Sequence, residues 1–186
     1  MKTGINQTNH ALWLTLLLSL PVVLHTGSGH AARQLPQPAP EFTHQDDDAW
    51  LNSKPLSLVE LRGKVVLLDF WTFDCWNCYR SFPWLRALES RMKNRAFMVV
   101  GVHTPEFDHE RQKIRLEEKV KSYRLRHPIM IDNDFSYWNA VGSRYWPSFF
   151  IIDKSGVIRA DFIGQTDLNS AQAEKIERIV ERLLAE

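Results

Sequence analysis

Two cysteines, Cys75 and Cys78, are the residues of this chain with the clearest capacity for chemistry. They are its only cysteines in 186 residues, and two residues separate them. Two cysteines are too few for a disulfide-stapled small domain or for a zinc site made of four thiolates. At this spacing, however, the second thiolate can attack a mixed disulfide formed by the first. The pair is therefore suited to thiol–disulfide exchange.

The position of the pair along the chain explains its expected reactivity. The almost continuous apolar run at residues 65–71 is typical of a strand buried on both faces. Residues 75–93 have apolar side chains about one turn apart, which predicts a helix. The unpaired N–H groups and the dipole at a helix N-terminus stabilise an anion. We therefore expect Cys75 to be the exposed thiolate nucleophile and Cys78, one turn later, to resolve the mixed disulfide.

A metal site is the first alternative use of the two cysteines. Zinc would need two further ligands, for which histidine is the usual partner of cysteine. Beyond the first thirty residues the histidines are scattered, without the close-pair spacing of a zinc site: His44, His103, His109 and His127. We expect no metal ion and no cofactor.

The remaining pattern predicts an α/β domain that holds the cysteines at the end of its first long strand. The other predicted elements are a strand at 96–103, a charged helix at 109–123, a short strand at 129–131, a helical turn at 137–141, a hairpin with strands at 148–153 and 157–162, and a C-terminal helix. Strands that alternate with helices imply a central sheet covered by helices on both faces. The hairpin makes that sheet mixed.

Residues 1–31 predict a signal peptide. Residues 11–24 form an apolar run, which is shorter than the roughly 20 residues that span a bilayer and suits a signal-peptide core. Gly29 and Ala31 occupy the small-residue positions of a cleavage site before Ala32. We expect a periplasmic location, with this segment cleaved there or retained as an N-terminal anchor. Disulfides form and persist in such a compartment.

The chain after the leader divides into a spacer and one domain. Residues 32–48 contain several prolines and a short acidic run, and they predict an extended linker that leaves 49–186 as the domain. Positive and negative side chains nearly cancel, with 23 Lys and Arg against 22 Asp and Glu. This balance disfavours a nucleic-acid binder, which would need excess positive charge.

The residues around the cysteines resemble those of the thioredoxin superfamily. Asp69 stands six residues before Cys75, where thioredoxins keep a buried acid, and Trp146-Pro147 precedes a strand where they keep a cis-proline. The resemblance implies a thioredoxin-like fold, a redox-active Cys75–Cys78 disulfide, and Asp69 as proton acceptor for Cys78. It also implies a cis bond before Pro147, with the backbone of Trp146 offered to an extended substrate.

Longer segments resemble the exported TlpA/ResA-type thiol–disulfide proteins and the thioredoxin-like domain of DipZ-type proteins. These segments are residues 61–71, 102–107, 131–134 and 144–147. The resemblance implies a reductase of protein disulfides that acts through a mixed disulfide and takes electrons from a separate membrane or periplasmic donor. Cytochrome c maturation, copper-site assembly and general disulfide repair all use this scaffold. The Trp76-Asn77 spacer differs from the Gly-Pro of thioredoxin, so the reduction potential cannot be transferred.

The neighbours of Cys75 allow two further predictions. Asp74 and Asp69 place negative charge near the thiolate, which disfavours it and favours a reducing potential. Trp71, Trp76 and Trp146 are expected to cluster around the sulfurs as a substrate-binding surface. Trp76 should be exposed, because it lies on the first turn of the helix; an exposed aromatic beside a nucleophile favours protein docking.

Two other functions remain open. The Thr72-x-x-Cys75 motif resembles a peroxiredoxin site, but Leu68 stands where that family keeps a proline. A copper-binding thioredoxin-like chaperone would use both cysteines with a distant histidine, for which His103 is the candidate. Those chaperones space their cysteines by three residues, whereas this chain spaces them by two. A thioredoxin-like module without redox activity is disfavoured by the intact cysteine pair together with Asp69 and Pro147.

Overall fold

The computed structural model describes residues 1, 4 and 34–186. The predicted signal peptide therefore lies outside the described residues, except for Met1 and Gly4. The chain divides into two units, Met1–Arg33 and Gln34–Glu186, and the second carries all the elements below.

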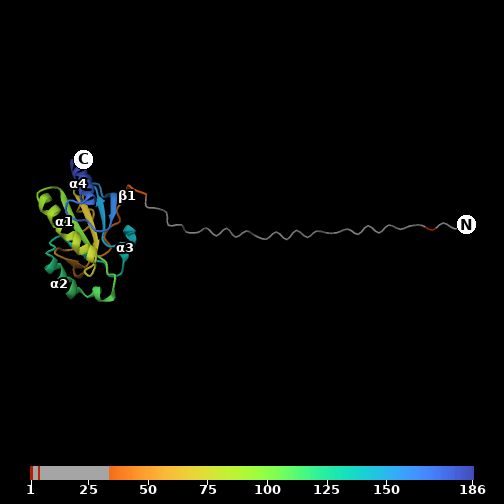
Figure 1. Cartoon of the computed structure of the whole chain (residues 1–186), viewed down its shortest axis with the longest axis horizontal. Coiled ribbons are helices and arrows are strands. Elements are labelled where there is room, and N and C mark those ends of the chain that lie inside the picture. Colours follow the sequence, from red (N-terminus) through yellow and green to blue (C-terminus); the bar gives the residue numbers. More distant parts are fainter. Residues whose placement is uncertain (2–3, 5–33) are drawn as a thin grey trace. The chain divides into compact units, whose positions relative to one another are not determined.

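Seven strands of the second unit form one mixed sheet (Figure 1). They are β1 (Gln37–Pro38), β2 (Trp50–Leu51), β3 (Val65–Trp71), β4 (Phe97–His103), β5 (Ile129–Ile131), β6 (Ser148–Ile152) and β7 (Val157–Ile163). Their order across the sheet is β1-β7-β6-β3-β4-β5-β2. Strands β3, β4 and β5 run parallel, and β6, β7, β1 and β2 join antiparallel. The mixed sheet with a β6–β7 hairpin confirms the predicted fold class.

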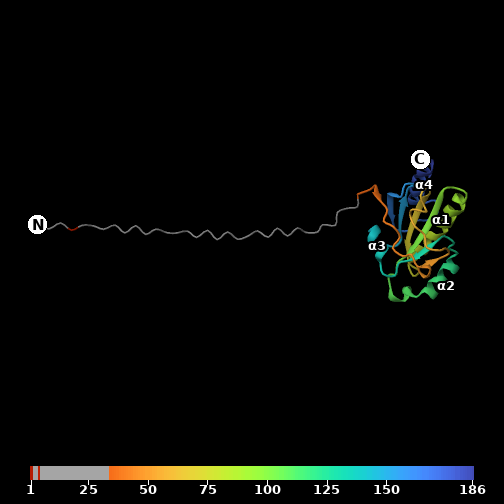
Figure 2. The same cartoon turned by 180° about the vertical axis from the view of Figure 1, so that it is seen from behind.

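Helices cover both faces of this sheet (Figures 1 and 2). They are α1 (Trp76–Met92), α2 (Lys113–Tyr123), α3 (Ser136–Val141) and α4 (Ala171–Ala185), with 3-10 turns at Asp47–Ala49 and Asp108–Arg111. Helices α1, α2 and α4 pack in one hydrophobic cluster, and α3 packs in the other. Among the described residues, no helix combines the length and the apolar character needed to cross a membrane.

Strand β3 supplies side chains to both clusters because successive side chains of a strand point to opposite faces. Val65, Leu67 and Trp71 lie in the cluster with α1, whereas Val66, Leu68 and Phe70 lie in the cluster with α3. By this alternation the side chain of Asp69 points to the α1 face. Every residue of β3 is buried, as its continuous apolar run predicts.

Part of the predicted linker lies inside the folded unit. Residues 32–48 predict an extended spacer, but Gln37 and Pro38 pair with Ile158 and Val157 of β7. Phe42 is buried, with its ring 5.3 Å from that of Trp50. Prolines are compatible with this edge position because an edge strand does not need every N–H for the ladder. The structure therefore begins the folded unit at Gln34.

The helix predicted at 109–123 is divided in the structure. A 3-10 turn at Asp108–Arg111 precedes α2, which begins at Lys113. Leu116 and Val120, four residues apart, face the core. Ile114 is exposed because it lies on the opposite face of the helix.

Candidate functional site

Cys75 and Cys78 form a disulfide at the start of α1. Their sulfurs are 2.11 Å apart and their Cα atoms 5.3 Å apart. Cys75 is the N-cap residue of the helix, and its Sγ accepts a hydrogen bond from the backbone N–H of Cys78 at 3.1 Å. Cys75 is partly exposed, whereas Cys78 is only 1% exposed. The two sulfurs thus differ in access in the order that their predicted roles require.

Asp69 lies on the face of β3 that α1 covers, and it is 1% exposed. Neither of its carboxyl oxygens has a hydrogen-bond partner among the described residues. Burial raises the pKa of Asp69 to about 7; the positive charge of His127 opposes this rise, and the negative charge of Glu89 adds to it. A carboxyl group with a pKa near neutrality can both take up and release a proton.

The bond between Trp146 and Pro147 is cis, as the resemblance predicts. The Trp146 ring stacks on that of Trp138 with centroids 4.3 Å apart. Its Nε1–H donates to the Thr104 carbonyl at 2.9 Å. Trp146 packs against both hydrophobic clusters, including the one that contains the two cysteines. Two neighbouring segments therefore hold this indole in place.

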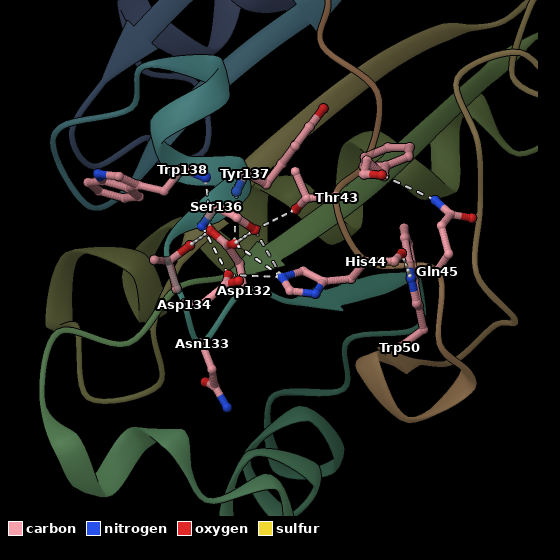
Figure 3. Close-up of polar contacts among 12 residues, drawn as sticks. Thr43, His44, Gln45, Trp50, Asp132, Asn133, Asp134, Ser136, Tyr137 and Trp138 are labelled. Atoms are coloured by element: carbon pink, nitrogen blue, oxygen red, sulfur yellow. Dashed lines mark hydrogen bonds and ion pairs between the residues drawn. The ribbon is translucent and has the colours of Figure 1, made fainter.

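Trp138 lies in the first turn of α3, which is anchored through Asp132 (Figure 3). The Asp132 carboxylate accepts hydrogen bonds from the backbone N–H groups of Tyr137 and Trp138 at 3.0 and 2.9 Å. It also accepts one from the Thr104 hydroxyl at 3.0 Å. Thr104 thus contacts both Asp132 and Trp146. The buried Asp132 carboxylate therefore holds both Thr104 and the start of α3, the two places that contact the Trp146 ring.

His44 joins the same polar cluster from the segment before β2 (Figure 3). Its Nε2 lies 3.1 Å from Asp134 and 3.5 Å from Asp132. Potential ligand atoms of these three residues lie within 4.8 Å of one another. All three side chains already have hydrogen-bonding partners in the protein, so the cluster serves to connect segment 43–44 to α3. The spacing of the histidines in the sequence does not reveal this grouping.

The three tryptophans do not form one surface around the sulfurs. Trp71 is fully buried and meets Phe82 edge to face at 5.3 Å. Trp76 is 67% exposed and stacks on Tyr79, which is 46% exposed, at 5.5 Å. The exposure of Trp76 is as predicted. Trp71 and Trp146 belong to the hydrophobic cluster that contains both cysteines, whereas Trp76 points from the first helical turn to solvent.

Asp74 is paired with two basic side chains. Its carboxylate lies 2.6 Å from Nε2 of His109 and 3.4 Å from Nζ of Lys119. The hydrogen bond with His109 lowers the pKa of Asp74, burial opposes this, and Lys119 lowers it further. The negative charge expected beside Cys75 is therefore balanced by residues 35 and 45 positions later in the chain.

Glu110 fixes the segment just before Cys75. It is 1% exposed, and its carboxylate accepts backbone N–H bonds from Asp74 at 3.0 Å and from Glu106 and Phe107 at 2.7 Å. The Tyr123 hydroxyl donates to the carbonyl of Phe73 at 2.9 Å. The sequence does not single out Glu110, because nothing in a charged segment identifies which acid will bind the backbone of a residue 36 positions earlier.

The residues of the two alternative functions are buried away from solvent. Thr72 is 1% exposed, and its hydroxyl lies 3.3 Å from Nε2 of His103. His103 is fully buried, stacks on Phe73 at 5.6 Å, and has a pKa lowered to about 4 by that burial. Neither residue is open to a ligand that arrives from solvent, so the geometry does not favour the peroxidase or the copper site.

Comparisons with known proteins agree with this fold. Residues 35–161 match the AhpC/TSA family. The chain is 38% identical over 135 residues to the chloroplastic protein SUPPRESSOR OF QUENCHING 1 of Arabidopsis thaliana, covering 72% of this chain and 13% of that protein. It is 37% identical over 123 residues to DipZ of Mycobacterium bovis, covering 64% and 18%. This chain thus spans less than a fifth of the length of these two relatives.

Shorter proteins match over most of their length. The thiol–disulfide oxidoreductase YkuV of Bacillus subtilis is 27% identical over 153 residues, which cover 82% of this chain and 98% of YkuV. The solution structure of a thioredoxin-like protein in its oxidised form matches with a TM-score of 0.70 at 27% identity, again over 82% of this chain and 98% of the other. The fold is thioredoxin-like.

Proposed function

The chain belongs to the AhpC/TSA family, and from that membership and the geometry of Cys75 and Cys78 we propose that it is a thiol–disulfide oxidoreductase that reduces protein disulfides. The observation that carries the proposal is the difference in access between the two sulfurs of one disulfide at a helix N-terminus. An exposed Cys75 can meet a bulky substrate. A buried Cys78 can react only with Cys75.

The proposed reaction begins with the reduced protein. The Cys75 thiolate attacks one sulfur of the substrate disulfide, and the other substrate sulfur leaves as a thiolate. Asp69 takes the proton of the Cys78 thiol, and the Cys78 thiolate attacks Sγ of Cys75. This releases the second substrate thiolate and forms the Cys75–Cys78 disulfide. Two electrons pass from the protein to the substrate, and a separate dithiol donor restores the reduced pair.

A trapping experiment tests this reaction. In Cys78→Ser the second step cannot occur, so a mixed disulfide between Cys75 and the substrate should accumulate and should be cleaved by added dithiothreitol. The matched variant Cys75→Ser should trap nothing and should not reduce insulin disulfides. If Cys75→Ser keeps the activity of the parent, the proposal is wrong. Turnover of peroxide by the parent with a thiol donor, without insulin reduction, would favour the peroxidase instead.

We propose that substrate polypeptide binds beside the disulfide, over Trp76 and along the Trp146-Pro147 segment. The exposed Trp76–Tyr79 pair offers apolar area next to Cys75. The backbone before β6 would receive an extended strand of the substrate. Trp71 is too deeply buried to touch a substrate, so its role is in packing around the site.

Trp76→Ala should separate binding from chemistry. We expect KM for insulin to rise about tenfold, corresponding to about 1.4 kcal/mol of lost contact. The rate with a small disulfide such as oxidised glutathione should stay within about twofold, because the thiol chemistry is unchanged. Phe107→Ala, a change at an exposed aromatic outside α1, is the control. Equal losses with both substrates would contradict a docking role for Trp76.

The direction of electron flow is part of the proposal. The basic side chains that the structure places at Asp74, next to Cys75, are His109 and Lys119, and both are paired with its carboxylate. We therefore expect a reduction potential near or below about −230 mV, between those of glutaredoxin and thioredoxin. Equilibration with glutathione or dithiothreitol measures it. A value near about −120 mV would identify a disulfide-forming oxidant.

We also propose that the domain works in the periplasm, where a membrane or periplasmic donor reduces it, with cytochrome c maturation as one process that uses such a reductase. The proposal rests on the apolar run at residues 11–24 and the small residues that follow. Fusion to a reporter that is active only after export tests it. A reporter that stays in the cytoplasm would refute the location without affecting the proposed chemistry.

A further inference from the structure

Asp69 is not the only buried ionisable group on the α1 face of the sheet. His127, in the segment between α2 and β5, is 4% exposed. Its Nε2 has no hydrogen-bond partner among the described residues, and the same is true of both carboxyl oxygens of Asp69. Each of these atoms is a buried donor or acceptor without a partner among the described residues, which costs free energy.

Gly101 explains how His127 comes near Asp69. Gly101 is the register partner of Asp69 on the neighbouring strand β4. A Cβ added at Gly101 would lie 3.1 Å from Nε2 of His127 and 3.1 Å from Nε1 of Trp71, closer than is usual for a Cβ. Because glycine has no side chain, the imidazole of His127 can lie against Gly101, the residue of β4 that is paired with Asp69.

Glu89 connects His127 to solvent. Its Oε2 lies 3.2 Å from Nδ1 of His127, an ion-pair distance at an angle outside that of a regular hydrogen bond. The His127 side chain is 1% exposed, whereas that of Glu89 is 25% exposed. Both line a pocket of about 580 Å³ that also contains four basic side chains, Arg86, Lys93, Arg124 and Arg126. Glu89 therefore shares this pocket with side chains of opposite charge.

We propose that His127 and Glu89 form a proton relay that links Asp69 to solvent through this pocket, on a route separate from the surface where substrate binds Cys75. The inference rests on the proposed oxidoreductase function and deepens it. It assigns His127 and Glu89 as positioning residues, since neither reaches the reacting sulfurs. Buried polar groups of this kind are commonly linked by an internal water molecule, and we place one between Asp69 and Nε2 of His127.

The relay completes the proton balance of the reaction. Resolution of the mixed disulfide leaves Asp69 with the proton taken from Cys78. Nε2 of neutral His127 accepts that proton through the water, and Nδ1 passes a proton to the Glu89 carboxylate, which releases it into the pocket. Asp69 is then again a base for the next turnover. The reverse path delivers a proton to Cys78 when a donor dithiol reduces the disulfide.

Chemical rescue of His127→Ala in the full chain is the first test. We expect steady-state insulin reduction to slow by about tenfold or more, because Asp69 would stay protonated after each resolution step and a positioned proton-transfer group contributes about 100-fold or more to a rate. Added imidazole should restore the rate by entering from the pocket. Pyrazole, a ring of the same size that hardly takes up a proton at neutral pH, should not. Rescue by both rings, or by neither, would mean that His127 only packs, and an unchanged rate would equally overturn the relay.

Conservative variants give a second test that needs no turnover. In the oxidised protein, carboxyl NMR should show the pKa of Asp69 falling in Glu89→Gln, which removes a nearby negative charge, and rising in His127→Gln, which removes an imidazole whose protonated form favours the Asp69 carboxylate. Glu117→Gln, an exposed acid on α2, is the charge-matched control and should cause no shift. Shifts of the same sign in both variants, or none, would overturn the relay.

The two tests separate this inference from the proposed function. A parent protein that reduces no disulfide refutes the oxidoreductase but still allows the Asp69 titration to be measured. A parent that reduces insulin normally, with no shift in Glu89→Gln or His127→Gln, refutes the relay alone.

Discussion

At the scale of single residues, Asp69 combines a stability cost with its proposed role as proton acceptor for Cys78. Its carboxyl group is buried without a hydrogen-bond partner among the described residues, and its pKa is raised to about 7. At high pH, burying an apolar or amide side chain at this position of β3 would cost less free energy than burying the Asp69 carboxylate. A proton acceptor beside a buried thiol, by contrast, must be titratable near neutral pH.

Asp69→Asn should therefore stabilise the oxidised protein in a pH-dependent way. The folded pKa, about 7, lies above the ordinary value of 3.8, so the native state holds this proton more tightly than the unfolded state does. Parent stability falls as the pH rises from about 4 to about 7, and the cost is complete above that, at about 4 kcal/mol. Asparagine removes this dependence, so its advantage should be large at pH 8 and should shrink below pH 5.

Urea unfolding of the oxidised parent and of Asp69→Asn at pH 5 and pH 8 measures this effect. Asp161→Asn, at an exposed position on β7, is the matched control and should show little difference between the two pH values. An equal advantage of Asp69→Asn at both pH values would mean that its carboxyl group does not titrate in this range. The same variant should also slow insulin reduction, since it cannot accept the proton of Cys78.

At the scale of elements, the segment between β4 and β5 holds the start of α1. Glu110 binds the backbone of Asp74, Tyr123 binds the carbonyl of Phe73, and Lys119 pairs with the Asp74 side chain. Lys119 also lies 5.5 Å from the centre of the Phe73 ring. The two residues that precede Cys75 are thus held by a helix and a turn that are remote in the sequence, which favours one fixed geometry of the cysteine pair.

Glu110→Gln should loosen this attachment. A buried carboxylate that accepts three backbone N–H bonds is replaced by an amide, which has one accepting oxygen and a donor facing N–H groups. We expect a loss of about 2–3 kcal/mol in the free energy of unfolding, by urea titration. Hydrogen exchange should be faster at residues 73–75 and 106–110. Glu106→Gln, an exposed neighbour, is the control, and equal stability of both variants would contradict the role of Glu110.

At the scale of the whole molecule, the folded unit extends further toward the N-terminus than its regular pattern of strands and helices suggests. β1 adds an edge strand to β7, and Phe42 packs on Trp50 and on Tyr137, with ring centres 5.3 and 5.1 Å apart. The polar contacts of Thr43 and His44 with the start of α3 follow directly (Figure 3). The face of the sheet opposite α1 is therefore closed partly by residues of the predicted linker.

Truncation tests this boundary. A chain of residues 34–186 should be more stable than one of residues 49–186 by about 2 kcal/mol or more, because the shorter chain loses the burial of Phe42 as well as β1. Phe42→Ala in the full chain should reproduce part of this loss. Thermal unfolding of the three proteins measures it. Equal stability of the two truncated chains would mean that residues 34–48 act only as a spacer, as the sequence predicts.

Local patterns in the sequence predict most of the secondary-structure elements and the cysteine pair. Buried strands and amphipathic helices leave a local pattern, so β3 and β5 have the predicted bounds and α1 begins one residue later than expected. The cysteine spacing and the resemblance around Asp69 and Pro147 identified the redox pair, the buried acid and the cis bond. These features depend on neighbours within a few residues of the chain.

Which charged side chains meet depends on the folded arrangement of distant segments. From the sequence alone, Asp74 is an unbalanced negative charge, yet the turn and helix that follow β4 bring His109 and Lys119 to it. Likewise, the approach of His127 to Asp69 depends on the register of β3 with β4 and on the absence of a side chain at Gly101. Pairings of this kind join residues tens of positions apart. Local sequence periodicity cannot predict them, because their energies depend on distance and burial in the folded chain.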